Sequence, residues 1–369
     1  MEKIGICTLY TGYNCGSALQ AYATKNVLKN INYDSDILKL SGSIISGRDV
    51  RFKKILITGI RMIFNSKDKK ATFKSFGLNN KKNINEKTIN SFDNFYNNYI
   101  EPKYFTYGQL KKEAKKDTYK DFICGSDQIW NSTTFYVDPF YYLKFAPKNK
   151  RVAYAPSFGR SYIPNYNKKI ISKNISEMKS ISIRETTGKD LIKKLTGKDV
   201  EVMIDPTLLL DKEDWKRILN LKNLDDKNYI FAYFLNEPNE KAKKMLNTIS
   251  KKCNLEIIFF NNNFDNGKSI FGGPIEFLTY LLNARIVMTD SFHGTAFAVN
   301  FHKKFFVFDR NYYTETQSTR ITSFLEIVKL KHIFNSDEDF KEEEYNFEIA
   351  DEILNKERQK AINYLKNNL

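Results

Sequence analysis

The sequence predicts an α/β fold in which two Rossmann-like halves, each built on a parallel sheet, face one another across a cleft. Three observations lead to this prediction. Apolar runs of strand length alternate with helical patterns along most of the chain. Glycine-bearing or polar turns follow several of these runs, at the sheet edge where open α/β folds bind ligands. Finally, 369 residues, of which 41% are hydrophobic, are enough for two domain cores.

The chain opens with a β–loop–α–β pattern. Residues 3–10 form an apolar run, and residues 11–17 a turn with two glycines. Residues 18–30 carry apolar side chains at helical spacing, and residues 35–40 read as the next strand. The turn lacks the GxGxxG spacing of dinucleotide sites, so the sequence predicts the fold but no such cofactor.

The same alternation continues to the end of the chain. Further strands are predicted at 118–124, 150–155, 181–183, 200–204, 229–235, 255–260, 286–288 and 305–308. Further helices are predicted at 189–195, 240–252, 274–283, 295–299, 321–328 and 349–369. We therefore expect an N-terminal domain at 1–208, a C-terminal domain at 209–345 and a closing helix at 346–369. Two Rossmann-like halves of this kind are typical of the GT-B architecture.

Composition narrows the classes of partner. The net charge of +16, from 59 basic and 43 acidic residues, fits nucleic acid, an anionic membrane surface or anionic small substrates. A genome bias towards Lys, Asn and Ile would produce the same charge. There is no zinc-finger, RNP or helix-turn-helix pattern, so we expect no nucleic-acid partner. The four scattered cysteines form no CxxC pair, which favours a reducing cytoplasm and predicts neither a metal site nor a disulfide. No signal peptide and no membrane-spanning run of 18 apolar residues is expected.

A basic insertion at 41–80 interrupts the α/β pattern. Between Arg48 and Lys74 there are nine Lys or Arg residues and two Asp residues, a net charge of +7. Apolar residues recur there at spacings of three and four, namely Phe52, Ile55, Leu56, Ile60, Ile63 and Phe64. This pattern predicts an amphipathic helix, either packed on its own domain, which we favour, or lying on anionic lipid.

The turn between the strand at 286–288 and the helix at 295–299 is the first candidate site. Asp290 and Ser291 are good N-cap residues, and a helix start with free N–H groups attracts phosphate or carboxylate. His293 would lie in the first turn, where a group that titrates near neutral pH can act as acid or base. A histidine that only packs in the core or caps its helix would give the same pattern.

Three other strand ends carry polar groups. Gly16 and Ser17 follow the first strand, and Ser126, Asp127 and Gln128 follow the strand at 118–124. Each set fits a small polar site and equally a tight turn. A further strand end places Arg184 where its guanidinium could hold a carboxylate or phosphate, or simply pair with Glu185 or Asp190 on the surface.

Several stretches, in this order, resemble the polysaccharide pyruvyl transferases. They are TGYNCGSALQ at 11–20, CGSDQIWN at 124–131, ISIRE at 181–185, DPTLL at 205–209, DSFHGTAFAV at 290–299 and STRI at 318–321. The ordered set spans roughly residues 3–330. The resemblance implies a GT-B-like fold and transfer of a pyruvyl group from phosphoenolpyruvate to a sugar, as a ketal.

The resemblance implies roles for Arg184, at the family's donor-binding arginine, and for His293, at the family's histidine. The other candidate site residues follow from their positions at strand ends and helix starts. Catalytic roles fall to His293 and Asp127. The donor-binding set is Arg184, Ser291, Gly294 and Arg320. The acceptor-binding set is Asn14, Gly16, Ser17, Gln20, Ser126, Gln128 and Trp130. Some ketal-forming members read R-L-H where this chain reads Ser291-Phe292-His293, so one expected arginine is missing. Arg285, Arg310 and Arg320 are the candidates to replace it.

The sequence thus favours a cytoplasmic transferase that uses phosphoenolpyruvate as co-substrate, without a cofactor or metal. Its acceptor would be a sugar of a cell-surface polysaccharide or a lipid-linked precursor, and a peripheral position at the inner membrane face fits the basic insertion. Two alternatives stay open. One is a GT-B glycosyltransferase with a nucleotide-sugar donor, and the other is a non-catalytic member that binds glycan or sugar phosphate.

Overall fold

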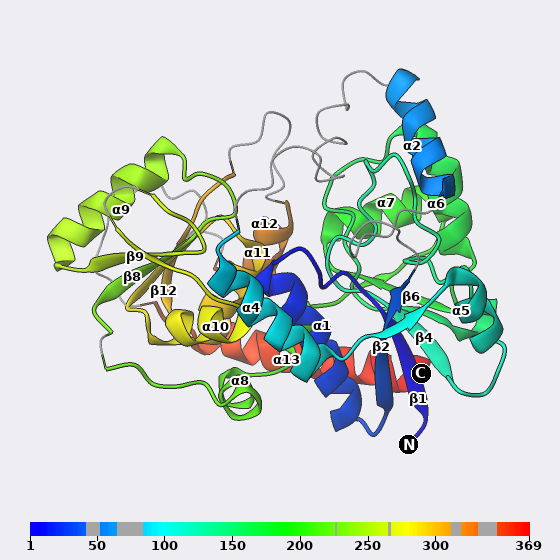
Figure 1. The fold of residues 1–369 in the computed structure, drawn as a ribbon, viewed down its shortest axis with the longest axis horizontal. Helices are drawn as coiled ribbons and strands as arrows, with labels where there is room; N and C mark the ends of the chain where they lie inside the picture. Colours follow the sequence, from blue (N-terminus) through cyan, green and yellow to red (C-terminus); the bar gives the residue numbers. More distant parts are fainter. Residues whose placement is uncertain (42–51, 65–83, 226, 265–266, 311–318, 331–344) are drawn as a thin grey trace.

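Two parallel sheets, each covered by helices, form the framework of the protein (Figure 1). The structure is a computed structural model, and it describes residues 1–41, 52–64, 84–225, 227–264, 267–310, 319–330 and 345–369. Within these residues the prediction of an α/β fold with two Rossmann-like halves is confirmed. The predicted domain boundaries at 208/209 and 345/346 stay predictions.

The first sheet has seven strands in the order β3-β2-β1-β4-β5-β6-β7, and all its pairs are parallel. Its strands are β1 (Lys3–Cys7), β2 (Asp34–Leu40), β3 (Lys103–Phe105), β4 (Asp121–Cys124), β5 (Arg151–Ala153), β6 (Ser180–Ile183) and β7 (Glu201–Val202). Strand order reverses direction between β1 and β4. In open parallel sheets this reversal is where ligands bind, beyond the carboxyl ends of the strands.

The second sheet has five strands in the order β10-β9-β8-β11-β12, again all parallel. Its strands are β8 (Tyr229–Tyr233), β9 (Glu256–Phe260), β10 (Lys268–Ile270), β11 (Ile286–Thr289) and β12 (Lys304–Val307). Here the order reverses between β8 and β11. Every residue of β8 and β11 is buried, as their near-continuous apolar sequences require.

Most predicted helices are present with bounds close to those expected. They are α1 (Cys15–Asn30), α7 (Thr186–Thr196), α9 (Glu240–Cys253), α10 (Pro274–Asn283), α11 (Phe292–Asn300), α12 (Thr319–Ile327) and α13 (Glu348–Asn368). Elements that the sequence analysis did not predict, besides β3 and β10, are α4 (Glu86–Phe95), the π-helix η2 (Tyr96–Ile100), α5 (Tyr107–Glu113), α6 (Asn165–Ser176), α8 (Lys212–Leu219) and the short 3₁₀ turns η3 (Lys148–Lys150) and η4 (Pro206–Leu208).

Helix α13 runs along both halves of the molecule (red in Figure 1). Near its start, His302 of the second half hydrogen-bonds Asp351 at 2.9 Å. Near its end, the Tyr364 hydroxyl donates to the Ala153 carbonyl of β5 at 2.9 Å, and Lys360 reaches the carbonyl of Val202. The closing helix therefore fastens the second half of the chain back onto the first sheet.

The two halves also share one hydrophobic core. Trp215 of α8 is fully buried, and its ring lies 6.4 Å from that of Tyr22 on α1 and 5.3 Å from that of Phe297 on α11. Its indole N–H donates to the carbonyl of Thr207. Because α1 and α11 start at the carboxyl ends of β1 and β11, this packing brings the two ligand-binding edges against one another.

The basic insertion contains the predicted amphipathic helix, α2 (Phe52–Phe64), but the favoured packing is wrong for its described side chains. Phe52 is 80% exposed, and Ile55, Leu56 and Ile60 are 47–51% exposed. Apolar residues at spacings of three and four predict that a helix has an apolar face. They do not predict whether that face points to the protein or to solvent. The side chains of Ile63 and Phe64 and the insertion residues 42–51 and 65–80 lie outside the described part.

Candidate functional site

The turn after β11 has the capped geometry that its sequence indicates. Ser291 is the N-cap of α11, and its side chain accepts from the N–H of Gly294 at 3.4 Å. Thr289 donates to the carbonyl of Tyr233 and accepts from the N–H of Ser291. A side-chain carbon on Gly294 would lie 2.5 Å from the Thr289 hydroxyl, so only glycine fits. Ser291 and Gly294, which were both predicted to bind the donor substrate, are thus hydrogen-bonded to each other.

His293 points from this turn onto the start of α1. A Cβ atom on Gly16 would lie 2.1 Å from His293 Nδ1, which means that the imidazole rests directly on the α1 backbone. Asn14 caps α1 and accepts from the N–H of Ser17, which fixes this first turn. His293 Nε2 lies 3.8 Å from Asp205 Oδ2 and makes no hydrogen bond to any described residue.

Around this histidine the two halves contribute a set of polar side chains, none more than 7% exposed. We call it the buried polar cluster; its members are Ser17, Ser126, Asp127, Arg184, Glu185, Asp205, His293 and Arg320. They come from the first turns of α1, α11 and α12 and from the segments that follow β4, β6 and β7. Buried charges persist only when paired or hydrogen-bonded, so each partner matters.

Two carboxylates of the cluster are ionised. Asp127 accepts from the Ser17 hydroxyl at 2.5 Å, and Asp205 accepts from Arg184 Nη1 at 2.6 Å and from the Ser126 hydroxyl at 2.9 Å. Burial acts to raise the pKa of each. The neighbouring His293 and Arg184 outweigh burial and hold the pKa of both carboxyls below their usual range, Asp205 furthest.

Arg184 is buried with part of its guanidinium unused. Nη1 is held by Asp205, and Nη2 lies 3.8 Å from Asp127 Oδ1. Nε and Nη2 donate no hydrogen bond to any described residue. Burial acts to lower the pKa of Arg184, but Asp205 and Asp127 outweigh it and raise the pKa. Two buried N–H donors without acceptors are costly unless a ligand supplies oxygen atoms.

A second buried guanidinium lies beside the first. The Arg184 and Arg320 carbons Cζ lie 4.5 and 5.9 Å from the ring centroid of Phe292, so one phenyl ring contacts both cations. With the amide oxygen of Gln128 turned toward it, Arg320 Nη2 donates at 2.5 Å. Burial and the nearby Arg184 lower the pKa of Arg320 to about 9, which still leaves it charged at neutral pH.

Glu185 joins the cluster instead of pairing with Arg184 on the surface. Its Oε1 accepts from the Ser157 hydroxyl at 3.0 Å and from the N–H of Phe158 at 2.9 Å, while Oε2 has no described partner. Complete burial raises the pKa of this carboxyl, and Arg184 and Arg320 offset only part of that effect. A buried carboxyl that retains its proton can serve as an acid.

Comparison with known proteins identifies the family. The family model "Polysaccharide pyruvyl transferase" matches residues 14–312. The chain belongs to this family. The match includes every member of the buried polar cluster except Arg320.

Solved structures resemble the fold at low sequence identity. The complex of MnaA from S. aureus with UDP aligns with a TM-score of 0.48 and 11% identity, over 89% of this chain and 82% of that one. UDP-GlcNAc 2-epimerase from Neisseria meningitidis bound to UDP-GlcNAc aligns at 0.46 and 11%, over 98% and 100%. ADP-heptose lps heptosyltransferase II from E. coli aligns at 0.37 and 8%, over 99% and 100%. A search of curated proteins gave no match.

The structure brings most of the predicted site residues together. Several of them make contacts that hold the fold in place. Gln20 donates to the Thr8 hydroxyl and the Leu9 carbonyl, and its amide oxygen accepts from the N–H of Ser126. It therefore ties the loops after β1 and β4 together. Gly16, which has no side chain, leaves room for the His293 ring, and Asn14 caps the start of α1.

Trp130 does not lie on the cluster. Its ring is 1% exposed, stacks on Tyr142 with centroids 5.1 Å apart, and donates its N–H to the carbonyl of Tyr141. A stacking platform for a sugar must be accessible, so this position contradicts the predicted acceptor role. Spacing in the sequence did not reveal which way the ring would turn.

Among the three arginines considered as replacements, Arg320 is the one beside Arg184. Arg285 is exposed at the amino end of β11, away from the carboxyl edge. Arg310 Nε donates to the backbone carbonyl of Asp290 and lies 3.6 Å from the side-chain carboxylate of the same residue.

Two members of the cluster were not predicted as site residues. Asp205 entered the sequence analysis only as the first residue of the DPTLL stretch, and Glu185 only as a surface partner of Arg184. Their signal in the sequence is weak: each is an acidic residue that follows a short apolar strand.

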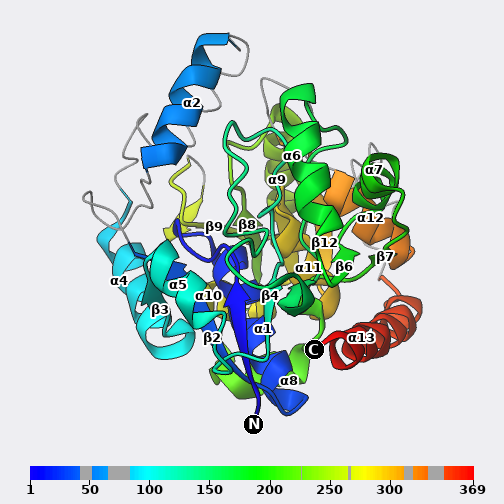
Figure 2. The same cartoon turned by 90° about the vertical axis from the view of Figure 1, so that its right-hand side faces the viewer.

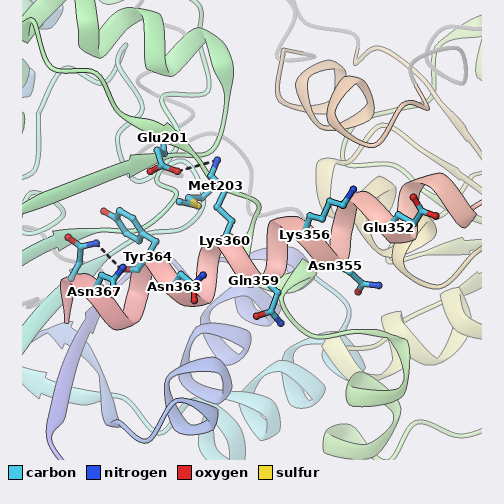
Figure 3. Close-up of a pocket in the computed structure, with 11 residues that line it drawn as sticks. Glu201, Met203, Glu352, Asn355, Lys356, Gln359, Lys360, Asn363, Tyr364 and Asn367 are labelled. Carbon is cyan, nitrogen blue, oxygen red and sulfur yellow. Dashed lines mark hydrogen bonds and ion pairs between the residues drawn. The ribbon is translucent and has the colours of Figure 1, made fainter.

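An open groove lies elsewhere, along α13 (Figure 3). It has a volume of about 890 Å³ and is lined mainly by amide and lysine side chains of that helix, including Asn355, Lys356, Gln359, Lys360, Asn363 and Asn367. None of the lining residues belongs to the buried polar cluster, so the groove is separate from the candidate site. In the described part of the chain, no group of His, Cys, Asp and Glu side chains is arranged to hold a metal ion.

Proposed function

We propose that the protein transfers a pyruvyl group from phosphoenolpyruvate to a sugar of a cell-surface polysaccharide or its lipid-linked precursor. Membership of the family supports a polysaccharide-modifying transferase. The observation that carries the proposal further is that Arg184 Nε and Nη2 and His293 Nε2 have no hydrogen-bond partner among the described residues. Both side chains approach the same oxygen, Asp205 Oδ2. These donors suit the oxygen atoms of a small anion held close to an acid–base group.

The donor carries a phosphate and a carboxylate, and each needs cations or N–H donors. Arg184 would hold one of them through a fork of two N–H groups. Arg320, which also contacts the Phe292 ring, would supply the cation that the R-L-H arginine provides in some other members. Ser291 and Gly294 were predicted to bind the donor directly. Because the N–H of Gly294 donates to the Ser291 hydroxyl, what they would offer the donor is the positive end of the α11 dipole.

Ketal formation needs a proton at the donor methylene carbon, which makes C2 electrophilic. One sugar hydroxyl then adds to C2, and a second displaces the phosphate, so that two C–O bonds form and one breaks. Glu185, whose pKa burial raises, and His293 are the groups we assign to donate the proton. Asp127, ionised and bonded to Ser17, can accept a hydroxyl proton.

The acceptor would approach from the first half of the chain, past Asn14, Ser17 and Gln128. A lipid-linked acceptor would bring this protein to the inner face of the cytoplasmic membrane as a peripheral protein. In the described part of the chain, no helix is long and apolar enough to cross a bilayer.

One binding screen tests the donor. The thermal unfolding midpoint is measured with phosphoenolpyruvate and with a panel of nucleotide sugars, for wild type, Arg320→Ala and the exposed-arginine control Arg285→Ala. We expect phosphoenolpyruvate to stabilise wild type and the control and to lose its effect on Arg320→Ala. Stabilisation by a nucleotide sugar alone would replace the proposal with a glycosyltransferase, and turnover would then release a nucleoside diphosphate instead of phosphate. Glycan binding with no turnover of any donor would indicate a non-catalytic member, an alternative that Ser291 in place of the R-L-H arginine favours.

A further inference from the structure

Helix α2 presents an apolar face to solvent, and its side turned to the protein carries two polar residues together with the half-buried Ile57 and Met62. Thr58 is 3% exposed and Arg61 is half-buried, both on the inner side. On the opposite side of the helix, Phe52 is 80% exposed, and Ile55, Leu56 and Ile60 are each close to half exposed. A surface helix of a globular protein ordinarily shows the reverse arrangement. An apolar face of this size on the outside indicates a binding surface.

Specific polar contacts hold the helix in this orientation. Arg61 Nη1 donates to the carbonyl of Phe135 and to Asn167 Oδ1, both at 2.7 Å, and Nη2 donates to the carbonyl of Tyr166 at 3.1 Å. The same guanidinium stacks 5.2 Å from the centre of the Tyr166 ring. Because α2 is anchored through Arg61, its outward face is a defined feature and not the result of a loose helix.

The charge around this face selects its occupant. Within α2 there are three basic residues and no acidic one. Lys53 is exposed beside the apolar face, and Lys54, like Arg61, is half-buried on the inner side. In the sequence, residues 48–74 carry nine basic and two acidic residues, a net charge of +7. Apolar side chains bordered by lysine are the composition of helices that lie in the headgroup region of anionic membranes.

The dimensions of α2 fit lying on a bilayer and not spanning it. Thirteen residues extend about 20 Å at 1.5 Å per residue, shorter than the roughly 30 Å hydrocarbon core. In Figures 1 and 2 the helix projects at the edge of the molecule, beside α6 and away from α13. A surface seated on α2 would therefore leave the junction of the two sheets uncovered.

We propose that α2 docks on an anionic lipid surface, with Phe52, Ile55, Leu56 and Ile60 entering the headgroup boundary and Lys53 contacting lipid phosphate. The link to a lipid-linked acceptor rests on the proposed function. Docking itself depends only on α2, so the two can fail separately.

Vesicle co-sedimentation of the full chain tests the docking. Wild type should bind vesicles of phosphatidylcholine and phosphatidylglycerol in equal parts at low salt, and not vesicles of phosphatidylcholine alone. Binding should weaken as salt shortens the screening length. The double variant Ile55→Ser/Leu56→Ser should lose about tenfold or more in affinity, because two apolar side chains no longer enter the interface. The control Ile349→Ser removes an isoleucine that is 54% exposed on α13, and it should bind as wild type.

Three results would overturn the proposal: no binding of wild type to anionic vesicles at low salt, equal binding by the double variant, or light scattering that shows a dimer lost in the double variant. The last would make α2 a contact between copies of this chain. Both changed residues are exposed, so folding should be kept. Turnover on a water-soluble acceptor should be unchanged in the double variant, and its absence in every protein tested would count against the transferase and not against docking.

Discussion

Replacing Gly16 with alanine tests the junction on which the site depends. A Cβ atom at this position would lie 2.1 Å from His293 Nδ1 and 2.6 Å from His293 Cβ. Real Cβ atoms do not approach other heavy atoms so closely, so either the imidazole or the start of α1 must move. His293 is 6% exposed and Gly16 is buried, so neither has free space to move into.

Two effects of opposite sign decide the magnitude. Alanine is favoured over glycine in a helix by about 0.5–1 kcal/mol. Forcing an extra carbon into a packed contact costs about 1–3 kcal/mol. We therefore expect Gly16→Ala to lower the free energy of unfolding by about 1–2 kcal/mol and to weaken donor binding, because His293 is displaced.

Gly108 offers a matched control. Gly16 and Gly108 are both the second residue of a side-chain-capped helix, α1 and α5, but a Cβ on Gly108 meets nothing within 4 Å. Gly108→Ala should be neutral or stabilising. Urea unfolding of both variants, followed by donor titration, gives the comparison. If Gly16→Ala unfolds at the same urea concentration as Gly108→Ala, the imidazole does not rest on α1 and the geometry described for the site is wrong.

Other predictions concern single members of the buried polar cluster. His293→Ala should lower turnover about 10²-fold, the usual effect of a lost acid–base group, with circular dichroism unchanged; turnover near that of wild type would refute its role. Arg184→Lys should weaken donor binding measured by calorimetry, since lysine cannot form the two-N–H fork, and an unchanged affinity would remove Arg184 from the donor site. The pKa of Asp205 is lowered on folding, so its stabilisation is present above its unfolded pKa of about 4 and is lost as pH falls below that value. The pKa of Glu185 is raised, so its contribution is favourable below about pH 4 and is lost as pH rises through the folded pKa. Glu185→Gln should accordingly be more stable than wild type at neutral pH in urea unfolding and equal to it in acid; a variant that is less stable at neutral pH would show that Glu185 is ionised.

The sequence predicted the parts of the fold that depend on local pattern. Helix α10 has the predicted bounds because Pro274 starts it and apolar residues then recur at helical spacing. The carboxyl-edge rule brought His293, Asp127 and Arg184 to one place, because parallel strands end at a common edge. These successes use information contained within about ten residues of each element.

What the sequence could not supply depends on contacts between distant segments. The pairing of Arg184 with Asp205 joins the ends of β6 and β7, and the burial of Glu185 depends on the loop after β5. Trp130 could equally have faced solvent, and only the position of Tyr142 places it inside. The direction in which the apolar face of α2 points also depends on distant contacts, since Arg61 orients the helix by bonding residues more than 70 positions away in the sequence.

The charges of the cluster lead to one further expectation about the donor. Arg184 and Arg320 are positive, and Asp127 and Asp205 are negative, so these four side chains sum to zero before any ligand binds. A trianionic donor placed among them would leave a buried excess of negative charge, which is costly.

Uptake of protons is the direct way to offset that excess, and the donor phosphate and the carboxylates of Asp127 and Asp205 that face it are the groups able to take one. We therefore expect phosphoenolpyruvate binding to be accompanied by net proton uptake. Calorimetric titrations at pH 7 in buffers of different ionisation enthalpy measure it, as a buffer-dependent binding enthalpy. The dependence should diminish in Asp127→Asn, which removes one facing carboxylate and keeps a side chain of the same size. A binding enthalpy that is the same in every buffer would mean that the donor is bound where Asp127 and Asp205 do not face it, and the cluster would then be structural.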